Sequence, residues 1–173
     1  MSEEIIGVQR QKVKLENISK SIYDSQFAIE KERLMKLLMG FYIAIEHIGS
    51  TSIPGLLAKP IVDIAVGIKD FNSIEDIILL LEKEYLYLPD HGETRRRIFI
   101  KKDGNLITHH IHIEEFGKQN WINHIVFRNK LLESEELREE YVALKKTLMA
   151  KYKDDRAKYT SAKAEFIQKV IHE

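Results

Sequence analysis

The alternation of apolar and polar positions predicts four strands in the first two thirds of the chain. The runs 41–48 and 61–68 are rich in β-branched and aromatic residues, which favour strands. The runs 97–101 and 106–114 flank the tetrapeptide KDGN, which is typical of a hairpin turn. We therefore expect the last two strands to be antiparallel neighbours, preceded by a turn at 89–94.

Helical spacing of apolar residues appears in two further segments of this region. In 24–40 they recur every three or four positions, and the segment ends on a glycine suited to a helix C-terminus. A second helix is expected over 74–83, with Asn72 or Ser73 as its N-cap. The short apolar stretch at 13–18 predicts either an edge strand or an arm packed on the domain.

The last third of the chain is predicted to be helical from Trp121 onward, with Ser134 capping the second of three helices. No proline or glycine follows Gly117. Together these elements predict an α+β fold in one domain, 1–173. A mixed sheet flanked by helices would occupy about 13–116, and a helical C-terminal region about 117–172.

Composition narrows the classes of partner and chemistry. The 173 residues suit one domain, and 27 basic residues balance 27 acidic ones, which argues against a dedicated nucleic-acid or membrane binder. The chain has no cysteine, which excludes disulfides, thiolate nucleophiles and Cys-ligated zinc. No apolar run is long enough for a transmembrane helix, and 1–12 lacks the apolar core of a signal peptide. We expect a cytoplasmic protein with a small-molecule ligand.

A candidate phosphate-binding turn follows the first predicted strand. Gly49 permits a sharp turn, and Ser50, Thr51 and Ser52 offer amides and hydroxyls that can point at one anion. Lys59 supplies a compensating charge. The plainer interpretation is a hydroxyl-rich turn that satisfies its own backbone.

An acidic residue lies within the next predicted strand. The two-residue period places Asp63 on the same face as Ala65 and Gly67, which leave space above the carboxylate. Burying a carboxylate is costly unless it is paired or binds a cation. Asp63 is therefore predicted either to pair with Lys59 or Arg97 or to bind a metal ion.

The last predicted strand carries two histidines and an acid on one face. By the same period Thr108, His110, His112 and Glu114 share a side. If this side adjoins Asp63, imidazole nitrogens and carboxylate oxygens can hold a divalent metal, or His112 can act as a general base. The simpler alternative is a polar strand facing solvent.

Guanidinium groups precede this strand at Arg95, Arg96 and Arg97, and they suit phosphate binding. Three consecutive residues of a strand cannot all face one pocket. Arg97 is predicted to bind phosphate, together with Lys101 on the same strand face, and the other two arginines are expected to be solvated.

Several strings together resemble the GrpB family: HIGSTSIPGLLAKPIVDI, THHIHIEEF, FRNKLL, EYVALKKTL and a final pattern of Arg156, Tyr159, Lys163 and Phe166. The resemblance extends from about residue 13 to 170. It implies a fold of the nucleotidyltransferase superfamily, similar to the palm of DNA polymerase beta. In that superfamily Gly49 and Ser50 resemble the Gly-Ser loop that holds a triphosphate, and Asp63 resembles the first metal-binding carboxylate.

The sequence departs from that pattern at the second acid. Transferring members of the superfamily usually carry an acid two residues after the first, where this chain has Ala65. Two-metal chemistry with Mg²⁺ or Mn²⁺ needs ligands on both sides of the reacting phosphate. His110, His112 or Glu114 are the candidates to replace the missing ligand. Asn129 and Gln26 also stand where the family commonly has aspartate and tryptophan.

Three functions follow as hypotheses. The first is metal-dependent nucleotidyl transfer, with Asp63 and His112 as catalytic residues. The second is a nucleotide- or phosphate-binding module that has lost transfer, as Ala65 suggests. The third is a metal hydrolase built on His47, His110 and His112.

Overall fold

The computed structural model describes residues 6–9, 14–89 and 95–173, and within them six strands form one mixed sheet. The strand order is β2-β3-β6-β5-β4, and β1 pairs with β6 outside this path. The strands are β1 (Val8–Gln9), β2 (Tyr42–Ile48), β3 (Val62–Ile68), β4 (Leu86–Leu88), β5 (Arg96–Asp103) and β6 (Leu106–Glu115). Only β3 and β6 are parallel to each other among these pairs.

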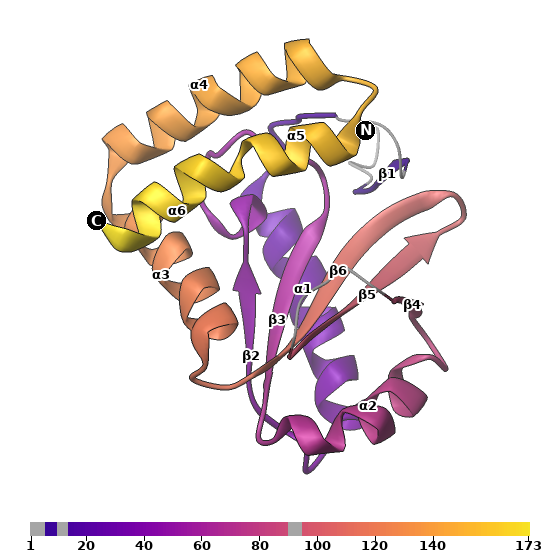
Figure 1. The fold of residues 1–173 in the computed structure, drawn as a ribbon. Helices are drawn as coiled ribbons and strands as arrows, with labels where there is room; N and C mark the ends of the chain where they lie inside the picture. Colours follow the sequence, from indigo (N-terminus) through magenta and orange to yellow (C-terminus); the bar gives the residue numbers. More distant parts are fainter. Residues whose placement is uncertain (1–5, 10–13, 90–94) are drawn as a thin grey trace.

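Helices cover both faces of the sheet (Figure 1). They are α1 (Lys20–Leu37), α2 (Ile74–Leu81), α3 (Gln119–Glu133), α4 (Glu135–Tyr152), α5 (Arg156–Ala162) and α6 (Ala164–His172). In Figure 1 the orange and yellow helices α4, α5 and α6 cross one end of the sheet, with α3 beside β2. The side-chain hydroxyl of Ser134 accepts a hydrogen bond from the Leu137 amide, as expected of an N-cap at the start of α4.

The main hydrophobic core lies between the sheet and the pair α1 and α2. Leu34 and Leu38 at the end of α1, Ile77 on α2, and Ile64 and Val66 on β3 are all completely buried there. The inward alternation along β3 explains this placement, because every second residue of a strand points to the same side. Burial of these aliphatic side chains fixes which face of each central strand is internal.

The opposite face of the sheet carries the polar and small residues of the same strands. Asp63 and Ala65 on β3 point to this side, as do His110 and His112 on β6. The helices α3, α5 and α6 cover this face of the sheet without filling the space above it. A cavity of about 1040 Å³ remains between them and the sheet.

The predicted α+β fold with a mixed sheet and a helical C-terminal region is confirmed, as are the hairpin of β5 and β6 and the cap at Ser134. Helix α1 begins at Lys20, before the predicted Asp24. The short strands β1 and β4 were not predicted, because two or three residues give too little alternation to recognise.

The predicted strand or arm at 13–18 does not form a strand in its described part, where Glu16 makes a single bridge to Ala58. Val13 and most of the predicted turn at 89–94 lie outside the described residues. In the described part of the chain, no helix has both the length and the apolar character that a membrane crossing requires.

Candidate functional site

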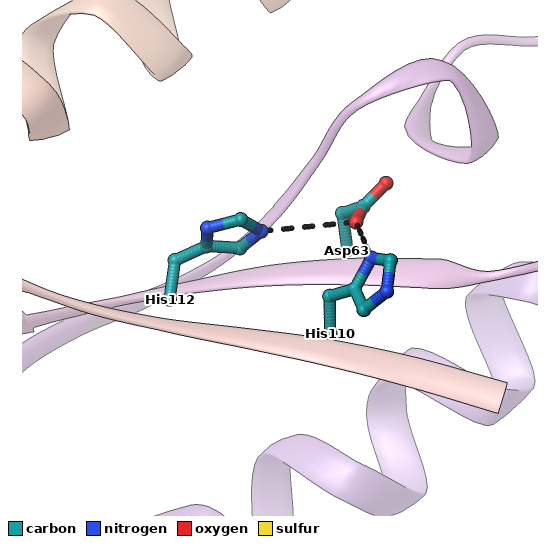
Figure 2. A group of neighbouring side chains, drawn as sticks. All are labelled: Asp63, His110 and His112. Atoms are coloured by element: carbon teal, nitrogen blue, oxygen red, sulfur yellow. Dashed lines mark hydrogen bonds and ion pairs between the residues drawn. The ribbon is translucent and has the colours of Figure 1, made fainter. Parts of the chain in front are cut away.

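Asp63, His110 and His112 meet at the parallel pair of strands in the middle of the sheet (Figure 2). In the register of this pair Asp63 lies beside His110, and Ala65 lies beside His112. His110 Nδ1 is 2.9 Å from Asp63 Oδ1, and His112 Nε2 is 3.7 Å from the same oxygen. The imidazole of His112 therefore stands next to the position where the superfamily would carry its second acid.

The hydrogen bonds of His110 define its proton position. Arg156 can only donate, and its Nη2 is 3.0 Å from His110 Nε2, which must accept. The other ring nitrogen then carries the proton and donates it to the Asp63 carboxylate. Burial alone raises the pKa of Asp63, but hydrogen bonds from the two histidines hold it well below its usual value. Asp63 is therefore ionised throughout the physiological pH range.

The predicted phosphate loop forms a turn of 3₁₀ helix (Ser50–Ser52) after β2. Gly49 adopts φ 70° and ψ −172°, and a Cβ placed there would lie 2.7 Å from Asp63 Oδ2. Glycine is thus required both by the backbone conformation and by the approach of the carboxylate. The loop and Asp63 Oδ2 face each other directly.

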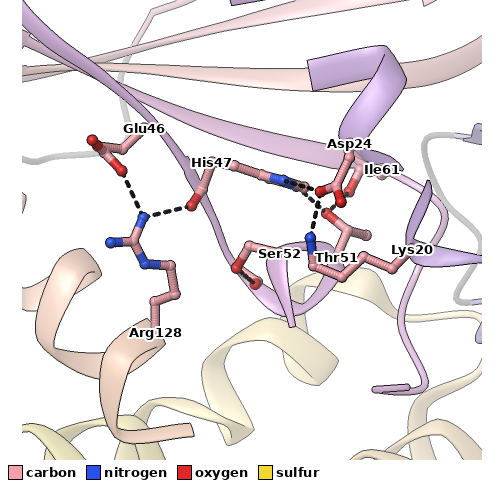
Figure 3. A network of polar contacts seen from close by, with 9 residues as sticks. Lys20, Asp24, Glu46, His47, Thr51, Ser52, Ile61 and Arg128 are labelled. Carbon is pink, nitrogen blue, oxygen red and sulfur yellow. Dashed lines mark hydrogen bonds and ion pairs between the residues drawn. The ribbon is translucent and has the colours of Figure 1, made fainter. Parts of the chain in front are cut away.

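Two of the predicted loop hydroxyls hold the loop in place (Figure 3). Thr51 Oγ1 donates to the Ile61 carbonyl at 3.2 Å and lies 3.0 Å from His47 Nε2, and Ser52 Oγ donates to the Gly49 carbonyl at 2.6 Å. For Thr51 and Ser52 the plainer interpretation of the turn is thus the one that the structure supports. From α3, Arg128 anchors the preceding strand through the His47 carbonyl.

Four cationic side chains surround the loop and Asp63. Lys59, Arg156 and Lys163 line the cavity together with Tyr141. Lys59 Nζ and Lys163 Nζ lie 5.7 and 4.7 Å from the centroid of the Tyr159 ring.

Lys145 completes this cation group from α4. It is almost fully buried and donates to the Leu57 carbonyl, with Ser50 Oγ 3.3 Å away. Ser50, alone among the three loop hydroxyls, is thus linked to a cation rather than to the loop itself.

The lysines are destabilised in their charged form. Burial, followed by the repulsion of neighbouring cations, lowers the pKa of Lys59 and of Lys145 to about 7. Burial also lowers the pKa of Lys163 to about 8, against the attraction of Asp63. Within the described residues, neither Lys59 nor Lys163 forms a salt bridge or a hydrogen bond with a carboxylate. The carboxylates of Asp63, Asp154 and Asp155 also line the cavity, but none of them is bonded to Lys59 or Lys163.

Glu114 was predicted to join Asp63, but it belongs to a neighbouring group. Its Oε1 is 3.0 Å from His124 Nε2 on α3, and its carboxylate is completely buried. Burial alone raises the pKa of Glu114, but the contact with His124 holds it below its usual value. His112 lies between the two groups, since its ring is 5.1 Å from that of His124.

Arg97 and Lys101 lie on the wrong face of the sheet for the predicted phosphate role. Arg97 is opposite Ile113 and stacks over Phe71, while Lys101 pairs with Glu30 on α1. The neighbour Arg96 points into the cavity instead. The aromatic residue Phe99, which shares a face with Arg97 and Lys101, was the available signal that this face is internal.

His47 does not join the other two histidines, which removes the geometric basis of the predicted three-histidine hydrolase. It lies opposite Ile64 in the β2–β3 pair, so its ring is on the α1 side of the sheet, stacked on Phe27. Burial lowers its pKa to about 4.

Sequence reasoning missed the cations that the C-terminal region directs toward the cavity. Lys145, Arg156 and Lys163 lie on helices whose many exposed charges conceal the few that turn inward. The signal that could have found them was their place in the strings that resemble the GrpB family. His124 was also missed, because a single histidine on a helix has no periodic partner.

The sequence matches the model of one known protein family. The family model described as GrpB protein matches residues 12–173. The chain belongs to the GrpB family. Both the family resemblance and the α+β fold predicted from the sequence are thereby confirmed.

Relatives in this family cover most of the chain. The protein YqkA of Bacillus subtilis is 36% identical over 143 residues, which span 82% of this chain and 41% of YqkA. The glutamate-rich protein GrpB of Alkalihalophilus pseudofirmus is 34% identical over 83% of this chain and 87% of its own. The crystal structure of the conserved protein GrpB from Enterococcus faecalis superposes with a TM-score of 0.80 at 33% identity, over 89% of this chain and 93% of that one.

Proposed function

We propose that this GrpB-family chain binds a nucleoside triphosphate with Mg²⁺ or Mn²⁺ in the cavity and transfers its nucleotidyl group to an acceptor. The observation that carries the proposal is the group of cations around Asp63. Lys59 and Lys163 are half-buried and lie over the ring of Tyr159, with no carboxylate bonded to either among the described residues. A bound polyanion would supply the negative charge that this part of the cavity lacks.

Lysine, arginine and backbone groups would each contact the triphosphate in a different way. Lysines act as point charges on phosphate oxygens, and an arginine can present two parallel donors. Lys59 and Lys163 both lie over the Tyr159 ring, and Arg156 reaches the cavity beside His110. Gly49 leaves its own backbone close to Asp63, so phosphate can approach both the loop and the carboxylate.

Asp63 fits a hard divalent cation through its second oxygen. Mg²⁺ is commonly bound by one or two carboxylates together with substrate phosphates and water. Oδ1 already accepts a hydrogen bond from His110 and has His112 Nε2 3.7 Å away, whereas Oδ2 faces Gly49. When bound there, the cation would neutralise charge on the triphosphate during transfer.

The histidines have a positioning role in this proposal. Both nitrogens of His110 are used, one by Asp63 and one by Arg156. Nε2 of His112 is directed at Asp63, and its Nδ1 is buried on the other side of the ring, so in this proposal His112 orients the carboxylate and does not act as the predicted general base (Figure 2). Neither imidazole is needed as a direct ligand of the Mg²⁺ or Mn²⁺ ion.

A transfer assay tests the proposal. Purified chain is incubated with each α-labelled nucleoside triphosphate, Mn²⁺ and a panel of hydroxyl and amine acceptors, and pyrophosphate release is measured. We expect release that Asp63→Asn abolishes and that Asp76→Asn, an exposed acid on α2, leaves unchanged. Absence of release together with absence of triphosphate binding would refute the proposal.

The second candidate is a binding module without transfer, and Ala65 favours it. Ala65 is fully buried in a cluster with Ile48 and Trp121, so a second acid could not be placed there without repacking. This alternative predicts tight binding of the metal–triphosphate with no pyrophosphate release for any acceptor. Binding measured by calorimetry beside the transfer assay separates the two functions.

A further inference from the structure

A second group of ligand-forming side chains lies next to the Asp63 site, where β6 meets α3. It consists of His112, Glu114 and His124, each of which offers one atom that lies within 4.8 Å of the other two. Glu114 is completely buried, and His112 and His124 are partly buried. Two imidazoles and a carboxylate are a donor set typical of Zn²⁺, Mn²⁺ and Fe²⁺.

The proton positions around Asp63 determine what His112 presents to this group. A carboxylate only accepts hydrogen bonds, and Asp63 Oδ1 faces Nδ1 of His110 and Nε2 of His112. The negative charge of Asp63, 3.7 Å from His112 Nε2, favours the tautomer of His112 that carries its proton on Nε2. Its Nδ1, on the other side of the ring in Figure 2, presents a lone pair.

Two acceptor atoms are consequently buried in this group without a donor. Neither His112 Nδ1 nor Glu114 Oε2 has a hydrogen-bond partner in the described part of the structure. Arg96 lies opposite Glu114 in the β5–β6 pair and contributes positive charge, but it donates no hydrogen bond to Oε2. Burying unpaired acceptors costs on the order of 1–3 kcal/mol each, and a cation would satisfy both at once.

We propose that His112 Nδ1, the Glu114 carboxylate and His124 Nε2 bind one transition-metal ion, separate from the divalent ion of the triphosphate. His124 Nε2 now faces Glu114 Oε1, so its proton would move to Nδ1 when the metal takes the lone pair. Asp63 then has the role of the outer carboxylate that holds a ligating histidine in its tautomer. Three protein ligands leave a coordination position open toward the cavity.

This site is chemically distinct from the Asp63 Oδ2 site of the proposed function. Oxygen ligands and phosphate select Mg²⁺ or Mn²⁺, whereas imidazole raises the affinity for later transition metals. The two sites share only the Asp63 to His112 contact. A failure of nucleotide binding therefore leaves this proposal intact, and the reverse also holds.

Cobalt spectroscopy of the whole chain tests the site without any nucleotide. The metal-free protein is titrated with Co²⁺ and then with Zn²⁺ in competition. We expect visible absorption bands that saturate at one Co²⁺ per chain and disappear when Zn²⁺ is added. His124→Gln should lower the affinity at least about tenfold, and Asp63→Asn about 10- to 100-fold, as is usual for loss of an outer-shell carboxylate.

A matched histidine variant and a measurement of folding serve as controls for this test. His172→Gln removes an exposed histidine at the end of α6 and should leave the titration unchanged. Circular dichroism of His124→Gln should match that of the unaltered chain. The proposal is overturned if the unaltered protein gives no saturable Co²⁺ bands, or if His124→Gln binds Co²⁺ as tightly as the His172→Gln variant.

Discussion

On the face of the sheet that α1 and α2 cover, the buried carboxylate of Glu30 accepts hydrogen bonds from both Lys101 and Tyr85. On the opposite face, Lys59 and Lys163 have no carboxylate bonded to them in the described part of the chain. The hydrogen bonds of Lys101 and Tyr85 hold the pKa of Glu30 below its usual value although burial alone raises it, whereas burial lowers the pKa of Lys59 to about 7. We call the first the complete face, because its charges are paired, and the second the incomplete face, which in our proposal is completed by a ligand.

The largest loss of stability is expected from a substitution on the complete face, where the charges are paired. Glu30 is 1% exposed, and Glu30→Gln removes its charge and replaces one of the two oxygens that accept from Tyr85 and Lys101 by an amide donor. We expect a loss of about 3 kcal/mol in the free energy of unfolding, measured by urea denaturation, since breaking a buried ion pair leaves an uncompensated charge. Glu32→Gln, on the exposed side of the same helix, should change stability by less than about 0.5 kcal/mol. A loss as small as that of Glu32→Gln would contradict the account of this face.

Gly49→Ala should have the next largest effect, and it acts on the cavity face. The added Cβ would lie 2.7 Å from Asp63 Oδ2, and the backbone has a positive φ. Gly55 in the same turn has the same φ of 70° with no atom near the added Cβ. We expect Gly55→Ala to cost about 1 kcal/mol through backbone strain alone. Gly49→Ala should cost about 2 kcal/mol or more and also weaken triphosphate binding. Equal losses in the two variants would show that Asp63 is not held against the loop.

Removing a lysine from the incomplete face should do the opposite of removing Glu30. Lys59→Met keeps the apolar stem beside Tyr159 and removes a desolvated charge. We expect the unfolding free energy of the ligand-free chain to rise by up to about 1 kcal/mol, because replacing a poorly compensated charge by an apolar group is often stabilising. A clear loss of stability in urea denaturation would mean that Lys59 is structural.

A further prediction concerns the pH dependence of the ligand-free chain. The pKa values of Lys59 and Lys163 are about 7 and 8, below the value of about 10.4 in an unfolded chain. The unfolded state therefore binds more protons between about pH 7 and pH 10, so stability rises with pH in this window. The penalty is fully present below pH 7. Urea midpoints at pH 7 and pH 9 measure the slope, which should be shallower in Lys59→Met. An equal slope in the two proteins would contradict the assignment.

The sequence predicted which residues share a face of one strand better than it predicted which strands lie side by side in the sheet. Alternation placed Asp63 with Ala65, and His110 with His112, because the two-residue period depends only on local geometry. The parallel register that brings Asp63 beside His110 could not be read from the sequence, since it is set by the long crossover between β3 and β6.

Two errors about charged residues have different physical origins. Arg97 was favoured over Arg96, although the apolar Phe99 on the same face as Arg97 marks that face as internal. Lys145 and Lys163 could not be recognised as buried from helical spacing, because α3 to α6 carry many solvated charges and the turn of each helix toward the cavity is decided by tertiary packing.

The central claim is that the uncompensated cations of the cavity bind a metal–triphosphate, and calorimetric titration of Mn²⁺-ATP tests it most directly. We predict saturable binding with a dissociation constant between about 1 µM and 1 mM, the range usual for enzyme substrates. Lys59→Met should weaken it by about tenfold or more, which corresponds to about 1.4 kcal/mol. Lys151→Met removes an exposed lysine that also lies over a tyrosine ring, 5.1 Å from the Tyr152 centroid, and should bind like the unaltered chain. Equal affinities in Lys59→Met and Lys151→Met, or no heat of binding in the unaltered protein, would contradict the claim.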